Sequence, residues 1–119
     1  EKDRWLLRGL SRYEGRLLTV YNDALYSVNA DGVVEEYVRL PWHAMNVMGF
    51  AVMGTKAIFL DARTNSLMVC MLSDTTVKAH KKINFSEHDE TLIRMCATHD
   101  ALFVALKREG KIVITKLYL

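Results

Sequence analysis

The residues of this chain that could bind a metal ion are few and widely separated. The four histidines stand at positions 43, 80, 88 and 99, and none has metal-site spacing to another histidine or to a cysteine. His88, Asp89 and Glu90 are consecutive, but consecutive side chains of a loop seldom converge on one ion. We therefore expect no metal site.

The sequence also lacks a recognisable set of catalytic residues. It has no Gly-x-Ser-x-Gly motif, and its six glycines stand singly rather than in a phosphate-binding loop. Cys70 and Cys96 lie within apolar runs, where a thiol is normally buried and unreactive. Glu35 and Glu36 are adjacent on an expected strand and would point to opposite faces. We expect a protein that is not an enzyme, with no catalytic residue and no cofactor.

The residues that best suit contact with a partner are Trp42 and His43, together with three side chains of expected hairpin tips. Trp42 and His43 follow Pro41 in a connection that should be polar, and tryptophan often anchors interfaces. Trp42 could instead fill a gap between neighbouring sheets. Asp31, Arg63 and Arg108 belong to the tips, which we expect to stand together at one end of the molecule.

Length and composition indicate a single folded all-β domain over residues 1–119. The chain is 50% hydrophobic and 25% charged, which is typical of folded domains. The net charge of +2 and the short basic run at 78–82 make nucleic acid an unexpected partner. No segment approaches the roughly 20 apolar residues of a membrane helix. Two cysteines without a disulfide framework favour an intracellular protein, cytoplasmic or nuclear.

A short phrase recurs three times and predicts hairpins. Each copy has a polar residue, an alanine, a branched aliphatic residue and an aromatic residue: Asp23–Tyr26, Lys56–Phe59 and Asp100–Phe103. A reversal follows each copy, at Asp31-Gly32, Thr64-Asn65 and Glu109-Gly110. Glycine and asparagine tolerate the positive φ of tight turns. The returning strands are predicted at Val33–Val38, Leu67–Leu72 and Ile112–Tyr118, where the last alternates clearly between two faces.

A further strand is expected before each phrase, so that each unit is an antiparallel meander. These strands are predicted at Arg16–Tyr21, Val47–Met53 and Leu92–Ala97, which gives units of about 16–40, 46–83 and 91–119. Val77–Ile83 could form a fourth, outer strand of the second unit, where its lysines would suit an edge. The segment Arg4–Tyr13 has apolar residues near helical spacing and fits a helix or a strand equally well.

Repeated meanders of this kind resemble the blades of β-propeller proteins. The stretch Leu25–Gly32, with its strand and Asp-Gly turn, is similar to a phrase common in propeller repeats. The Gly-His and Trp-Asp pairs of WD repeats and the double glycine of kelch repeats are absent, so no subfamily is identified. About three blades cannot close a ring, which takes about four to eight. The resemblance therefore implies completion by copies of the chain, by another chain or by more of a longer protein.

The same strand pattern also fits a β-sandwich or a small barrel. With the propeller resemblance, the sequence predicts a non-catalytic protein–protein interaction or scaffold module that binds another protein chain or itself. The alternative is a small-ligand or carbohydrate-binding β domain. That alternative requires equivalent tip residues in each unit, whereas Asp31, Thr64 and Glu109 differ.

Overall fold

A computed structural model describes residues 9–42, 47–73, 76–86 and 89–119, and strands are the only extended regular elements within these residues. In chain order they are β1 (Ser11–Tyr13), β2 (Arg16–Tyr21), β3 (Ala24–Val28), β4 (Val34–Arg39), β5 (Val47–Met53), β6 (Lys56–Asp61), β7 (Ser66–Leu72), β8 (Val77–Asn84), β9 (Glu90–Ala97), β10 (Leu102–Arg108) and β11 (Lys111–Leu117). The predicted all-β fold class is confirmed.

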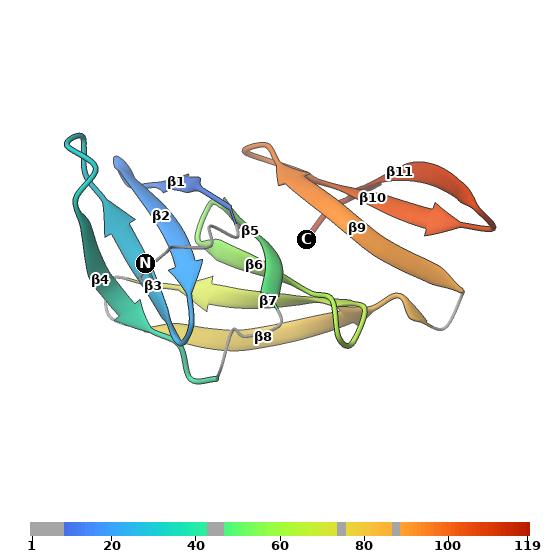
Figure 1. Cartoon of the computed structure of the whole chain (residues 1–119), viewed down its shortest axis with the longest axis horizontal. Coiled ribbons are helices and arrows are strands. Elements are labelled where there is room, and N and C mark those ends of the chain that lie inside the picture. Colours follow the sequence, from blue (N-terminus) through green and yellow to red (C-terminus); the bar gives the residue numbers. More distant parts are fainter. Residues whose placement is uncertain (1–8, 43–46, 74–75, 87–88) are drawn as a thin grey trace, which may run out of the picture.

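The strands form three antiparallel meander sheets, in which each strand pairs with its neighbours in the chain (Figure 1). The first sheet has the order β1-β2-β3-β4, the second β5-β6-β7-β8 and the third β9-β10-β11. The turn residues explain the reversals, because Gly32, Asn65 and Gly110 all have positive φ, of 81°, 54° and 78°. The three predicted reversals are therefore confirmed.

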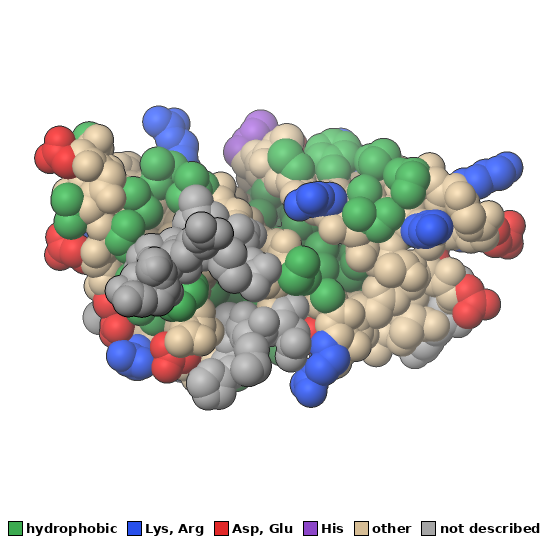
Figure 2. Space-filling model, viewed as in Figure 1, with side chains coloured by type: hydrophobic (Ala, Val, Ile, Leu, Met, Phe, Trp, Pro, Cys, Tyr) green, Lys and Arg blue, Asp and Glu red, His purple; other side chains and the backbone are tan. Residues whose placement is uncertain are grey.

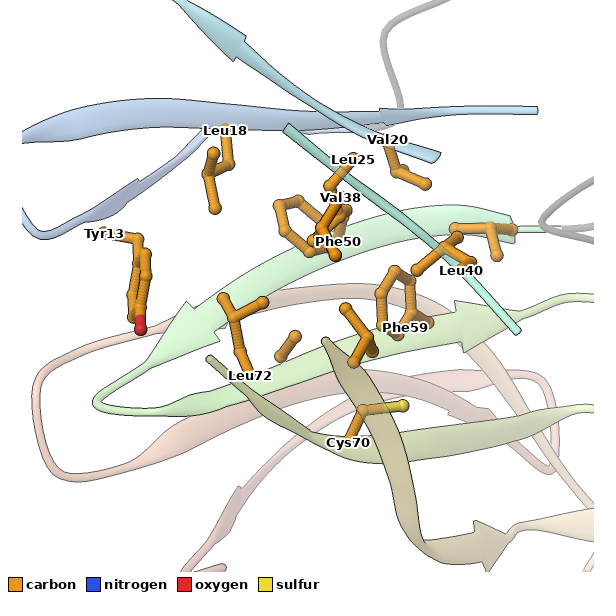
Figure 3. Close-up of a cluster of buried hydrophobic side chains, with 13 residues drawn as sticks. Tyr13, Leu18, Val20, Leu25, Val38, Leu40, Phe50, Phe59, Cys70 and Leu72 are labelled. Carbon is orange, nitrogen blue, oxygen red and sulfur yellow. The ribbon is translucent and has the colours of Figure 1, made fainter. Parts of the chain in front are cut away.

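The second sheet is the middle layer of the molecule, because its two faces are both covered. In β6 the consecutive residues Ala57, Ile58, Phe59 and Leu60 are all buried, although their side chains alternate between the faces. Ala57 and Phe59 pack in the cluster shared with the first sheet, whereas Ile58 and Leu60 pack in the cluster shared with the third. Figure 3 shows the first cluster, with Leu18 and Leu25 of the first sheet directed toward Phe50 and Phe59.

The first strands of the three sheets lie next to one another. β5 contacts β1 on one side and β9 on the other. The backbone N–H of Val52 donates a 2.8 Å hydrogen bond to Ser11 Oγ, which ties β5 to β1. The first strands β1, β5 and β9 of the three sheets thus follow one another in a row, and we call them the innermost strands.

The structure can be compared with two predictions, one for an outer strand after residue 76 and one for the segment Arg4–Tyr13. β8 extends over Val77–Asn84 and is the edge strand of the second sheet, as predicted. Of the segment Arg4–Tyr13, residues Ser11–Tyr13 form a strand, and residues 4–8 lie outside the described part. Because β1 pairs with β2, the first sheet begins at Ser11, before the strand expected at Arg16.

Like the first sheet, the third sheet packs one face against the second sheet, and its other face has no covering layer among the described residues. Its β11 alternates as predicted: Ile112 and Ile114 are 62% and 64% exposed, while Val113 and Thr115 are half-buried. Tyr118, just beyond β11, is 71% exposed. Figure 2 shows hydrophobic side chains gathered over this part of the molecule, with basic side chains among them.

Candidate functional site

The described hairpin tips do not all stand at one end of the molecule. Asp31 lies in the exposed β3–β4 turn, where Asn29 Oδ1 accepts the backbone N–H groups of Asp31 (2.9 Å) and Val33 (3.0 Å). Trp42 follows the opposite end of β4, a strand of six residues, so about 20 Å of strand separates it from this turn. Asp31 therefore cannot act together with Trp42 on a small ligand.

Arg108 is occupied within the fold by an ion pair with Glu90. Its Nε donates to Glu90 Oε2 at 2.6 Å and its Nη2 contacts the same oxygen, while the Glu90 side chain is only 10% exposed. Asn65 reaches the same strand from the second sheet, since its Oδ1 accepts the N–H of Leu92 at 2.8 Å and its Nδ2 donates to the carbonyl of Glu90. The Asn65 contacts connect the second and third sheets, and the ion pair between β9 and β10 makes Arg108 a structural residue.

Trp42 and Arg63 are the two candidate residues that the structure brings together. Both line a cavity of about 240 Å³ on the face that the second sheet turns toward the first. The other lining residues come from β5 to β8 and the β6–β7 turn: Val47, Phe59, Asp61, Thr64, Met68 and Lys82. His43, the remaining candidate, lies outside the described residues.

The register of β6, β7 and β8 determines which side chains lie side by side at the floor of this cavity. Phe59 lies opposite Met68 in the β6–β7 pair, and Met68 lies opposite Lys82 in the β7–β8 pair. The Trp42 ring meets Phe59 edge-on, with centroids 4.8 Å apart and planes at 89°. Trp42 is held there because the preceding Leu40 is buried and donates its N–H to the Asp23 carbonyl at 2.8 Å. Trp42 therefore fills a gap between the first and second sheets, which was the alternative to an exposed interface residue.

The polar groups around the cavity are mostly hydrogen-bond donors. Trp42 Nε1 is buried and has no hydrogen-bond partner in the described structure. Among the described residues, no carboxylate lies within ion-pair distance of Arg63 or Lys82. Asp61 Oδ1 is engaged in the turn, where it accepts the N–H groups of Arg63 (2.9 Å) and Thr64 (3.2 Å). The site is therefore suited to an acceptor rather than a donor.

Lys82 is the cavity residue that the sequence did not single out. It belongs to the short basic run at 78–82, whose lysines we expected to suit an edge strand, and only the register of β8 with β7 places it opposite Met68. Two further cavities, of about 370 and 460 Å³, lie along the innermost strands β1, β5 and β9. Within the described residues, no three His, Cys, Asp or Glu side chains group as a metal site.

The two cysteines differ, although the sequence predicted both to be buried. Cys70 is buried, and burial raises the pKa of its thiol from 9.0 to about 11. Cys96 is exposed because it lies beside Phe103 on the uncovered face of the third sheet, which corrects the prediction for this residue. Both thiols are free.

We expect dilute native chain at pH 8 to take up one equivalent of iodoacetamide, at Cys96. The Cys70 thiol is inaccessible and protonated at this pH, and alkylation requires the thiolate. Mass spectrometry before and after unfolding in urea checks this, with a second equivalent expected only after unfolding. Rapid labelling of Cys70 in the native chain would show that the cluster between the first two sheets is not packed as described.

The chain matches no protein-family model, and neither the curated proteins nor the solved structures compared with it gave a match. None of the described residues form a helix long and apolar enough to cross a membrane.

Proposed function

We propose that this chain is a non-catalytic protein–protein interaction module of the β-propeller type. The observation that carries the proposal is the uncovered face of the third sheet. The second sheet shows what such a face requires, since both of its faces are covered by a neighbouring sheet. A large exposed apolar patch on a water-soluble protein marks an interaction site.

The side chains of this face are arranged for an apolar contact with a basic border. Strand register places Cys96, Phe103 and Lys116 in one cross-strand row, and Arg94, Ala105 and Ile114 in the next. Between these rows lies a hollow of about 160 Å³ that an apolar side chain of a partner could fill. Lys116 Nζ lies 5.7 Å from the Phe103 ring centre, so the basic border covers part of the apolar surface.

The edge of the third sheet supports the same proposal. The first two sheets have four strands, whereas β11 is the last described strand of the third sheet and has no partner on its outer side. An unpaired edge presents backbone N–H and C=O groups that can pair with a strand of another chain. A partner sheet or a second copy would cover the face and continue the series of innermost strands β1, β5 and β9. Two free cysteines fit an intracellular setting for such a module.

Alkylation of Cys96 tests this proposal, because the thiol lies on the proposed interface. We expect its labelling rate to fall as the concentration of the chain rises, since association covers the third sheet. In the double variant Ile112→Lys/Ile114→Lys the rate should stay constant, because two buried charges would weaken association on the order of a hundredfold. Val33→Lys, which changes an exposed apolar residue of the β3–β4 turn, should behave like the wild type. A Cys96 rate independent of concentration in the wild type would contradict self-association through this face.

A further inference from the structure

We propose that the cavity beside Trp42 binds the carboxylate of an acidic peptide segment that also carries an apolar side chain. The cavity lies on the face of the second sheet that is turned toward the first, whereas the proposed association surface belongs to the third sheet. The inference therefore adds a second binding site to the proposed function, with its own ligand chemistry.

The buried indole nitrogen of Trp42 is the first argument. An indole N–H can only donate, and leaving a buried donor without an acceptor destabilises the fold. Trp42 Nε1 is such a donor in the described structure, although its ring is well packed against Phe59. An oxygen of a ligand bound in the cavity would supply the missing acceptor once the indole, whose nitrogen is shielded from solvent in the described structure, turns its N–H toward the cavity.

The two cations on the lining are the second argument. Arg63 and Lys82 carry donors only, and no described carboxylate is close enough to pair with either of them. Asp61 is the one acidic residue among the described residues of the lining, and the turn already uses its Oδ1. Two positive charges beside one negative charge favour an anion, and charge-assisted hydrogen bonds from both cations would strengthen its binding.

The charge of the surrounding sheet points to an acidic partner. Between residues 47 and 86 the sequence has two carboxylates, Asp61 and Asp74, against five basic residues: Lys56, Arg63, Lys78, Lys81 and Lys82. A one-sided potential of this kind attracts a partner of opposite charge before contact.

The apolar floor and the size of the cavity favour a peptide over a nucleic acid. Val47 and Phe59 are almost fully buried beneath it, and Met68 extends the apolar surface toward Lys82. A leucine or similar side chain next to the carboxylate would contact this floor. A nucleic acid would need a continuous basic groove along its backbone, whereas this cavity of about 240 Å³ admits one or two side chains.

Nuclear magnetic resonance of the full ¹⁵N-labelled chain tests the proposal through the Trp42 indole N–H signal, assigned with Trp42→Phe. The probe is a capped peptide of alternating glutamate and leucine, and its control has glutamine in place of glutamate. We expect the acidic peptide to move the signal saturably and the control to leave it unchanged. Arg63→Gln and Lys82→Gln should each weaken binding on the order of tenfold. Lys78→Gln, on the same strand but outside the cavity, should stay within about twofold.

A third peptide, capped at its amino end only and free of acidic side chains, distinguishes the source of the carboxylate. A shift of the Trp42 signal with this peptide supports a chain terminus as ligand, and a shift only with the glutamate peptide supports acidic side chains. Equal binding of the glutamine control, equal loss in Lys78→Gln and Lys82→Gln, or no shift with any peptide would overturn the proposal. So would a shift with a single-stranded oligonucleotide alone. None of these outcomes depends on whether the third sheet associates.

Discussion

Replacing Phe59 with alanine is expected to destabilise the fold by about 3–5 kcal/mol, the largest effect of any single change considered. Phe59 is 1% exposed and lies between the first and second sheets. It contacts Phe50, with ring centres 5.2 Å apart, and supports the ring of Trp42. Removing the ring leaves a cavity that its neighbours cannot close, because Phe50 is fixed in β5 and Trp42 follows the buried, hydrogen-bonded Leu40.

Urea unfolding followed by circular dichroism measures this effect. Folded domains are stable by about 5–15 kcal/mol, so Phe59→Ala could be partly unfolded in water. Phe59→Leu provides a milder variant, with an expected loss of about 1–1.5 kcal/mol. Leu17→Ala, at a 39% exposed position of the first sheet, is the control and should cost less than about 1 kcal/mol. Equal losses in Phe59→Ala and Leu17→Ala would contradict the packing of the first two sheets against each other.

Arg108→Ala is expected to cost about 2–3 kcal/mol, because it leaves the Glu90 carboxylate without its cation. Breaking a buried ion pair costs about 3–5 kcal/mol, and the partial exposure of Arg108 lowers this figure. Glu90 cannot move out into water easily, since its strand is held by both Asn65 hydrogen bonds.

A double variant without either charge separates this ion pair from general effects of the substitutions. Glu90→Gln/Arg108→Gln removes both charges and should lose less stability than Arg108→Ala, measured by urea unfolding. Lys107→Ala is the matched control, because Lys107 neighbours Arg108 but is exposed and forms no ion pair among the described residues. If Arg108→Ala and Lys107→Ala were equally mild, Glu90 and Arg108 would not connect β9 to β10 as described.

Strand positions could be predicted from the sequence because hydrophobic alternation and turn residues are local signals. Ile112 to Leu117 alternate, and Gly110 before them adopts the positive φ that its residue type suggested. β1 was harder to predict, since three residues after Gly9 carry too short a pattern to distinguish a strand from a helix.

The repeated alanine phrase does not mark the same strand in each sheet. Ala24 begins β3, the third strand of its sheet, whereas Ala57 lies in β6, the second strand of its sheet. The second strands β2, β6 and β10 begin at residues 16, 56 and 102, a more even spacing than that of the alanines. Strand sequences share a period of two, so one strand is easily aligned with its neighbour.

Which residues line the cavity depends on strand register and on packing between sheets, and neither can be predicted from a local sequence pattern. Trp42 and Arg63 were singled out by residue type, and the fold placed them at one cavity. Arg108 was also chosen by residue type, but it forms an ion pair with Glu90, 18 residues earlier, and is not available to a partner. Cys96 was expected to be buried because its neighbours are apolar, and that reasoning fails where a sheet face has no covering layer.

The solution mass of the chain alone, measured by light scattering after size exclusion, tests the central claim most directly. Because the third sheet exposes Ile112, Ile114 and Tyr118 on one side, we expect the wild-type chain to be a dimer or a larger assembly. Ile112→Lys/Ile114→Lys should elute as a folded monomer and Val33→Lys as the wild type. A wild-type chain that stays monomeric at high concentration, with dispersed amide signals, would contradict the proposal that copies of the chain associate through this face.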